Sequence, residues 1–222
     1  MAKKKNKWLY RALCAALAVT LVSGMAVMSP VADIVGTSIT ANAADYNTWD
    51  TCQWKIEDGT LYIKGTIPDT GGNSLGNRAP WNEEKSTIKK VYAEPGTKTS
   101  ADATFLFYEL TNTTSMDLSN LDTSAATSMS CMFTSCSALT TLDLNGWDTG
   151  NVTDMTCMFQ DCTNLATLDL SGWNTSSVTT MSYMFRYCSN LVTIYVSSDW
   201  TISTVTSSSA MFKDCTNIKG GK

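Results

Sequence analysis

The second half of the chain repeats a motif of the form Met-Phe-x-x-Cys at nearly constant spacing. The four Met-Phe pairs begin at Met132, Met158, Met184 and Met211, in steps of 26, 26 and 27 residues, and a cysteine follows each pair in the same register. A period of this length is typical of solenoid proteins, in which each coil buries its apolar side chains against the next coil. The repeat therefore predicts one stack of coils.

Each copy of the repeat divides into two parts. Leu139, Leu142 and Leu144 follow the spacing L-x-x-L-x-L, which is typical of the strand of a leucine-rich repeat. After a glycine-containing turn, the apolar residues of segment 152–162 recur with the i, i+3, i+4, i+7 spacing of a short amphipathic helix. The predicted fold class is α/β: a leucine-rich-repeat-like solenoid with parallel strands and short helices.

The register of the repeat extends upstream of the four motifs. Phe107 lies one period before Phe133, and a degraded strand around Val91 lies one period before the next strand. We therefore expect the solenoid to occupy residues 86–222 in about five coils, of which the last is incomplete.

The segment before the solenoid has a different pattern. Residues 44–85 contain alternating runs on both sides of Asp58-Gly59, and this dipeptide favours a β-hairpin. Trp49, Trp54 and Trp81 are available to cover the open end of the first coil. We expect the segment to be a β-rich N-terminal cap.

The N-terminus has the composition of an export signal. A basic patch that ends at Arg11 precedes an apolar run over residues 12–28, and Ala41-Asn42-Ala43 follows. We expect residues 1–43 to be a signal peptide, with an uncleaved membrane anchor as the alternative. Cleavage would remove five basic groups and leave the mature chain more acidic than the net charge of −4 of the whole sequence. An acidic chain disfavours nucleic acid as a partner. The sequence contains no second apolar run long enough to predict a membrane span.

The chain lacks histidine, which excludes Ser-His-Asp catalysis and histidine metal sites. In a stack the repeated cysteines form a line, which cannot surround a metal ion, so we expect no metal site and no cofactor. With Cys14 in the leader, an odd number of the eight cysteines remains. One disulfide involving Cys52 stays an alternative, but the favoured interpretation is buried thiols that fill the core.

The outward side of the predicted strands carries polar residues. Asp143 and Asp169 stack there, and Tyr195 replaces the aspartate in the next coil. We expect the carboxylates to be solvated or hydrogen-bonded, with calcium binding as the alternative. A solenoid presents its strand face as an extended docking surface, and Tyr195 is the best single anchor on it. Nine residues are the candidate binding residues: Thr141, Asp143, Asn145, Thr167, Asp169, Ser171, Thr193, Tyr195 and Ser197.

Two repeats carry a family likeness. The stretches "LDLNGWDTGNVTDMTCMFQDCTNL" and "LDLSGWNTSSVTTMSYMFRYCSNL" resemble the repeats of BspA-like leucine-rich-repeat surface proteins, and "DGTLYIKGT" and "APW" resemble the segment that precedes those repeats. The resemblance implies an exported protein of a Gram-positive-type bacterial surface, secreted or cell-wall associated, that adheres to host matrix or to other cells. It supplies no catalytic residues. Many members end in an anchoring device, and we expect none in this chain because its last residues, "NIKGGK", carry no wall-sorting motif.

Three functions of different kinds are consistent with these features. The leading hypothesis is an exported, non-catalytic binding protein for an extracellular protein or glycan. The second is a structural or self-associating repeat module, because an incomplete last coil exposes apolar surface and a strand edge. The third is a polysaccharide-active enzyme, which is disfavoured because the aspartates recur with the repeat and none is singled out.

Overall fold

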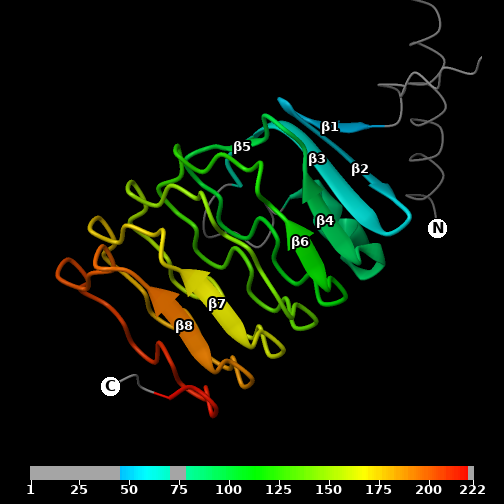
Figure 1. The fold of residues 1–222 in the computed structure, drawn as a ribbon. Helices are drawn as coiled ribbons and strands as arrows, with labels where there is room; N and C mark the ends of the chain where they lie inside the picture. Colours follow the sequence, from blue (N-terminus) through cyan, green and yellow to red (C-terminus); the bar gives the residue numbers. More distant parts are fainter. Residues whose placement is uncertain (1–45, 71–78, 220–222) are drawn as a thin grey trace, which may run out of the picture. The chain divides into compact units, whose positions relative to one another are not determined.

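The computed structural model describes residues 46–70 and 79–219, and from Asn47 on these residues form one stack of coils; the expected signal peptide lies outside the described residues. Figure 1 shows the strands of successive coils side by side, from β1 to β8. The strands and the one 3₁₀-helix of the described part have these bounds: β1 Asn47–Trp49, β2 Cys52–Glu57, β3 Thr60–Ile67, η2 Pro80–Thr87, β4 Lys90–Ala93, β5 Lys98–Thr99, β6 Ser115–Asp117, β7 Thr167–Leu170 and β8 Thr193–Val196. Together they make a solenoid of about five turns.

The predicted N-terminal hairpin is confirmed. Strands β2 and β3 are antiparallel, and Glu57 pairs with Thr60 across a turn in which Asp58 and Gly59 have φ of 48° and 74°. This left-handed region favours the Asp-Gly pair that the sequence places there. The far side of β3 pairs in parallel with β4, so the hairpin also supplies the first rung of the solenoid sheet.

Three tryptophans cover the first coil from the hairpin side. The ring of Trp81 is fully buried, with its centroid 6.5 Å from that of Phe107 and 5.5 Å and 6.1 Å from those of Trp49 and Trp54. The indole N–H of Trp81 donates to the backbone oxygen of Leu106 at 3.1 Å. The cap therefore donates a hydrogen bond to a backbone oxygen of the first coil and also covers the apolar surface of that coil.

The predicted parallel strands are confirmed in most coils. In β7 and β8 the paired residues include Leu168 with Ile194, and β4 pairs with β6 in the same sense. Residues 141–144 are an exception, because they keep the alternating burial of a strand but pair with neither β6 nor β7. Leu142 and Leu144 remain buried there, so core packing holds this segment in register.

The predicted short helices are wrong. Residues 155–162 form a series of turns, in which Cys157 and Asp161 have φ of 57° and 59°. Three of the amides donate three residues back, as from Met158 to Met155 at 3.3 Å, and four donate to the next coil, as from Phe159 to Met184 at 2.9 Å. In an α-helix all of these amides would donate four residues back within the same coil, so none of them would form a hydrogen bond to the next coil. In the described part of the chain, no helix is long and apolar enough to cross a membrane.

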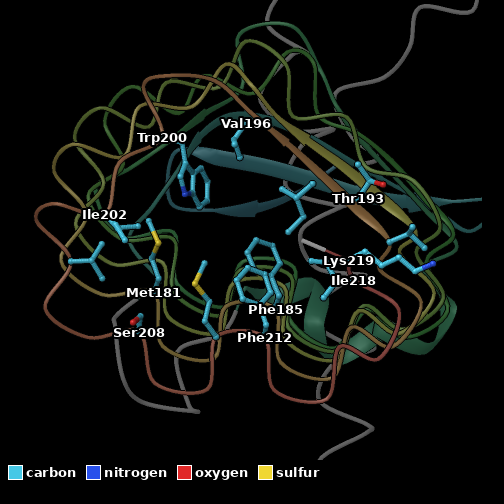
Figure 2. Close-up of a pocket in the computed structure, with 14 residues that line it drawn as sticks. Met181, Phe185, Thr193, Val196, Trp200, Ile202, Ser208, Phe212, Ile218 and Lys219 are labelled. Carbon is cyan, nitrogen blue, oxygen red and sulfur yellow. The ribbon is translucent and has the colours of Figure 1, made fainter. Parts of the chain in front are cut away.

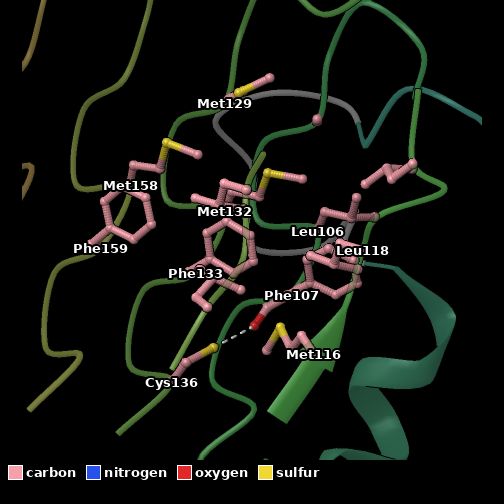
Figure 3. Close-up of a cluster of buried hydrophobic side chains, with 14 of the residues drawn as sticks. Leu106, Phe107, Met116, Leu118, Met129, Met132, Phe133, Cys136, Met158 and Phe159 are labelled. Carbon is pink, nitrogen blue, oxygen red and sulfur yellow. Dashed lines mark hydrogen bonds between the residues drawn. The ribbon is translucent and has the colours of Figure 1, made fainter. Parts of the chain in front are cut away.

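The repeated Met-Phe pairs form the core of the stack. Their rings stack coil on coil, with centroid distances of 5.6 Å from Phe133 to Phe159 and 5.5 Å from Phe159 to Phe185. Figure 3 shows the rings of Phe107, Phe133 and Phe159 in a row, with Met132 and Met158 beside them. All members of the stack before the last coil are fully buried, which identifies the motif as core.

A column of threonines ties the coils together inside the stack. The hydroxyl of Thr149 donates to the backbone oxygen of Asn174 at 3.0 Å and accepts the N–H of the same residue at 3.0 Å. Thr123 and Thr175 make the equivalent pair of bonds in their coils. Each buried hydroxyl is thereby satisfied, as burial of a polar group requires.

Candidate functional site

The outer face of the strands is the surface on which the sequence places the candidate binding residues. In β7, Leu168 and Leu170 are buried and Thr167 and Asp169 are exposed, as the alternation predicts. Strand β8 pairs with β7 in register, so Asp169 lies beside Tyr195. The structure therefore brings the predicted residues of these two coils onto one face.

Seven of the nine predicted residues are exposed, and Thr193 and Ser197 are half-buried. Tyr195 is 56% exposed, but it lies in the last strand of the described stack, where no further coil shields it. Its exposure therefore reflects its position at the end of the solenoid as well as its outward orientation.

The stacked aspartates have a local structural role. Each carboxylate accepts the backbone N–H two residues later: Asp117 from Ser119 at 3.3 Å, Asp143 from Asn145 at 3.0 Å and Asp169 from Ser171 at 2.9 Å. The hydrogen bonds from Ser171 hold the pKa of Asp169 below its ordinary value. The hydrogen-bonded interpretation of this column is therefore confirmed, since these carboxylates stabilise the turn that ends each strand. Within residues 46–70 and 79–219, no group of three or more Cys, Asp or Glu side chains is arranged to hold a metal ion.

The outer face also contains a groove on β3, β4 and β6, which was not predicted from the sequence. Tyr62 of β3 pairs with Tyr92 of β4, and Tyr92 pairs with Asp117 of β6. The two tyrosine rings are 6.0 Å apart in an edge-to-face arrangement. Lys90 and Ser115 also line this groove, which has a volume of about 480 Å³.

The groove combines two kinds of contact. The tyrosine rings offer rigid apolar surface with a hydroxyl at one end, and the Nζ of Lys55 lies 5.2 Å from the ring centroid of Tyr62. Lys90 and Asp117 add opposite charges within the same lining. Such a mixture suits a ligand that has both apolar faces and hydrogen-bonding groups.

The repeated cysteines are free thiols in the described part of the chain, and all of them are buried except Cys215, which is half-buried, so the favoured interpretation is confirmed for the interior coils. No disulfide forms there, and Cys52 is a buried thiol whose pKa burial raises to about 12. Figure 3 shows the thiol of Cys136 directed at the backbone oxygen of Phe107, at 3.1 Å. The other three motif cysteines do the same: Cys162 to Phe133 at 3.2 Å, Cys188 to Phe159 at 3.0 Å and Cys215 to Phe185 at 2.7 Å. A small apolar group with a weak donor fits this position.

Two other cysteines lie one above the other on the turns. The backbone N–H of Cys131 donates to the oxygen of Thr156 at 2.8 Å, which puts Cys131 and Cys157 in register. Both side chains are half-buried. A hydrogen bond from the Cys157 thiol lowers the pKa of Cys131 to about 7, and the same contact raises the pKa of Cys157.

Cys131 is expected to be the first cysteine that iodoacetamide modifies at neutral pH, because the thiolate is the reactive form. A short exposure of the native protein followed by peptide mass spectrometry measures the order of modification. Cys215 is the internal control, because it is also half-buried but burial raises its pKa. Equal rates at Cys131 and Cys215 would contradict the proposed activation.

Comparison with known proteins gives a family for the chain. No curated protein matches it. Among solved structures it is similar to a leucine-rich repeat protein from Eubacterium ventriosum ATCC 27560, with 18% sequence identity and a TM-score of 0.40. That alignment covers 69% of this chain and 44% of the other, so the chain spans less than half of that protein. Residues 101–221, more than half of the chain, match the family described as "Mycoplasma protein of unknown function, DUF285", and the chain is therefore a member of the DUF285 family.

Proposed function

We propose that this chain is an exported, non-catalytic binding protein that attaches to an extracellular protein or glycan through the outer face of its strands. The observation that carries the proposal is the row of outward side chains on that face. Strand register gives two parts of this row: Tyr62, Tyr92 and Asp117 across β3, β4 and β6, and Asp169 and Tyr195 across β7 and β8. Hydrogen bonds between coils fix the spacing of these groups, so binding costs little additional ordering.

Two sequence features support an adhesive role outside the cell. The basic patch and apolar run at the N-terminus support export. The likeness of the repeats to BspA-like surface proteins supports adhesion to host matrix or to other cells at a Gram-positive-type surface. The net charge of −4 favours a ligand other than nucleic acid.

The groove at Tyr62 and Tyr92 is expected to contribute most to binding, because partly buried tyrosines are typical of binding hot spots. The purified protein would be tested against immobilised matrix proteins and a glycan array, and the strongest ligand would be titrated. The double variant Tyr62→Ala/Tyr92→Ala is expected to bind that ligand at least tenfold more weakly. Each lost hot-spot side chain costs about 2 kcal/mol or more.

The matched control is Tyr183→Ala/Tyr187→Ala, which removes two half-buried tyrosines from the Met-Phe turns. It is expected to bind normally. A third variant, with alanine at Asp143, Asp169 and Tyr195, tests the other end of the face. Unchanged affinity in both outer-face variants, with melting temperatures equal to wild type, would show that the strand face is not the binding surface.

A further inference from the structure

The last coil exposes apolar side chains whose counterparts in the earlier coils are buried. Phe212 is 43% exposed, although it stacks on the fully buried Phe185 at 5.3 Å. Val196 is 48% exposed, whereas Leu170, which pairs with it in the previous coil, is fully buried. All the exposed large apolar side chains of the described residues belong to this coil: Val192, Tyr195, Val196, Ile202 and Phe212.

All of these side chains except Tyr195 line a hollow of about 770 Å³ at the C-terminal end of the stack. Figure 2 shows Val196, Trp200, Ile202 and Phe212 directed into it. Strand β8 has one neighbour, β7, so its other edge carries backbone groups that no strand of the described chain pairs. An apolar patch beside an unpaired strand edge marks an interaction surface.

The opposite end of the solenoid is closed. Cys52 and Trp81 of the cap are fully buried. Two side chains of the cap donate hydrogen bonds to backbone oxygens of the first coil. The indole of Trp81 donates to Leu106, and the amide of Asn82 donates to Tyr108 at 2.6 Å. A second copy therefore cannot stack its C-terminal end on this N-terminal end without displacing the cap. Strand β1 also leaves one edge without a strand partner in the described chain, but no exposed large apolar side chain of the described residues lies at that end. Head-to-tail growth is therefore disfavoured, and two copies meet best through their C-terminal ends.

A contact between two identical ends is also compatible with the polar groups around the hollow. The last coil carries both charge signs, at the exposed residues Asp199, Lys213, Asp214 and Lys219, so two copies do not present a surface of one sign to each other. A twofold axis makes the two β8 edges antiparallel, and a strand edge offers both N–H and C=O groups to such a partner. Serine hydroxyls and the carboxylate of Asp214 supply acceptors on the turn side.

We infer that the C-terminal coil docks on the same coil of a second copy and forms a closed twofold dimer. The two open hollows then face each other and cover the exposed ends of the core columns. Such an isologous contact closes after two copies. The inference goes beyond the proposed ligand binding and does not depend on it, although a dimer would display two outer faces and so raise avidity.

Sedimentation of the purified protein, in the presence of a thiol reductant to exclude mixed disulfides, tests the inference. The wild type is expected to pass from monomer to dimer with increasing concentration and to stop at dimer. The variant Val196→Lys/Ile202→Lys places charge at the centre of the contact and is expected to raise the dimer dissociation constant at least tenfold. The control Ala125→Lys/Ala166→Lys adds the same charge at exposed positions of interior coils and is expected to dimerise like the wild type.

Three results would overturn the inference. The first is a wild type that stays monomeric at high micromolar concentration. The second is a species that keeps growing with concentration, which would mean an open rather than a closed contact. The third is equal dimerisation of the two lysine variants while circular dichroism shows both folded. The measurement needs no ligand, so its failure leaves the test at Tyr62 and Tyr92 unaffected.

Discussion

Replacement of Phe159 by alanine is expected to lower the free energy of unfolding by about 3–5 kcal/mol, the usual cost of removing a buried phenylalanine. Its ring is fully buried and stacks on Phe133 and Phe185, at 5.6 Å and 5.5 Å, with Trp173 at 6.2 Å. The cavity would therefore lie between coils and weaken two interfaces. Urea unfolding followed by tryptophan fluorescence measures the loss.

Phe212→Ala is the matched control for this prediction. Phe212 occupies the same position of the motif, but it stacks on one side only and is 43% exposed. Its loss is expected to be less than half that of Phe159→Ala. Because the stability of a solenoid is a sum of coil and interface terms, Phe159→Ala is also expected to separate unfolding into two transitions. Equal losses for the two variants would contradict a continuous aromatic stack.

Most of the fold can be predicted from the repeat period. Residues one period apart occupy equivalent places in neighbouring coils, so the spacing of Met132, Met158 and Met184 already implies that their side chains meet. The structure buries all three methionines in one apolar core, and it confirms the parallel strands and the hairpin at Asp58-Gly59. The stacked aspartates are hydrogen-bonded, one of the two states expected of them from the sequence.

The helix prediction failed because apolar periodicity does not distinguish a helix from a tight arc. Met155, Met158, Phe159 and Cys162 face the core in either conformation. What decides between them is where the backbone amides donate, and alternate amides donate to the next coil. That choice depends on the neighbouring coil, which local sequence does not show.

The groove at Tyr62 and Tyr92 could not be found from the repeat. Tyr62 belongs to the hairpin, and the step from β3 to β4 passes through η2 and is longer than one repeat, so the two tyrosines share no column of the motif. The outward alternation of each strand was visible in the sequence, but their register was not. The tryptophan cap was easier to predict, since Trp49, Trp54 and Trp81 had no other apolar surface to cover.

The protein is expected to unfold at alkaline pH because its buried thiols resist ionisation. Burial raises the pKa of Cys136 and Cys188 to about 12, from an ordinary value of 9.0, and raises the pKa of Cys162 well above that value. The unfolded chain releases these protons near pH 9, whereas the folded chain retains them. The stabilisation from neutral thiols is therefore complete below about pH 9 and is lost as the pH rises towards 12.

The size of the effect follows from proton linkage. Each thiol that is ionised only in the unfolded state lowers the free energy of unfolding by about 1.4 kcal/mol per pH unit. Several thiols act together, and domains of this kind have only about 5–15 kcal/mol in total. We therefore expect a sharp fall in urea midpoint above pH 9, measured in reductant.

Two serine variants separate this cause from the titration of lysines and tyrosines in the same range. Cys162→Ser keeps a donor for the backbone oxygen of Phe133 but cannot ionise, so its stability is expected to fall less steeply, by about 1.4 kcal/mol per pH unit. Cys131→Ser is also expected to reduce the alkaline slope, because it removes the contact that raises the pKa of Cys157. Identical slopes for the wild type and Cys162→Ser would mean that the thiols inside the stack titrate freely, which is incompatible with a closed core of methionine, phenylalanine and cysteine.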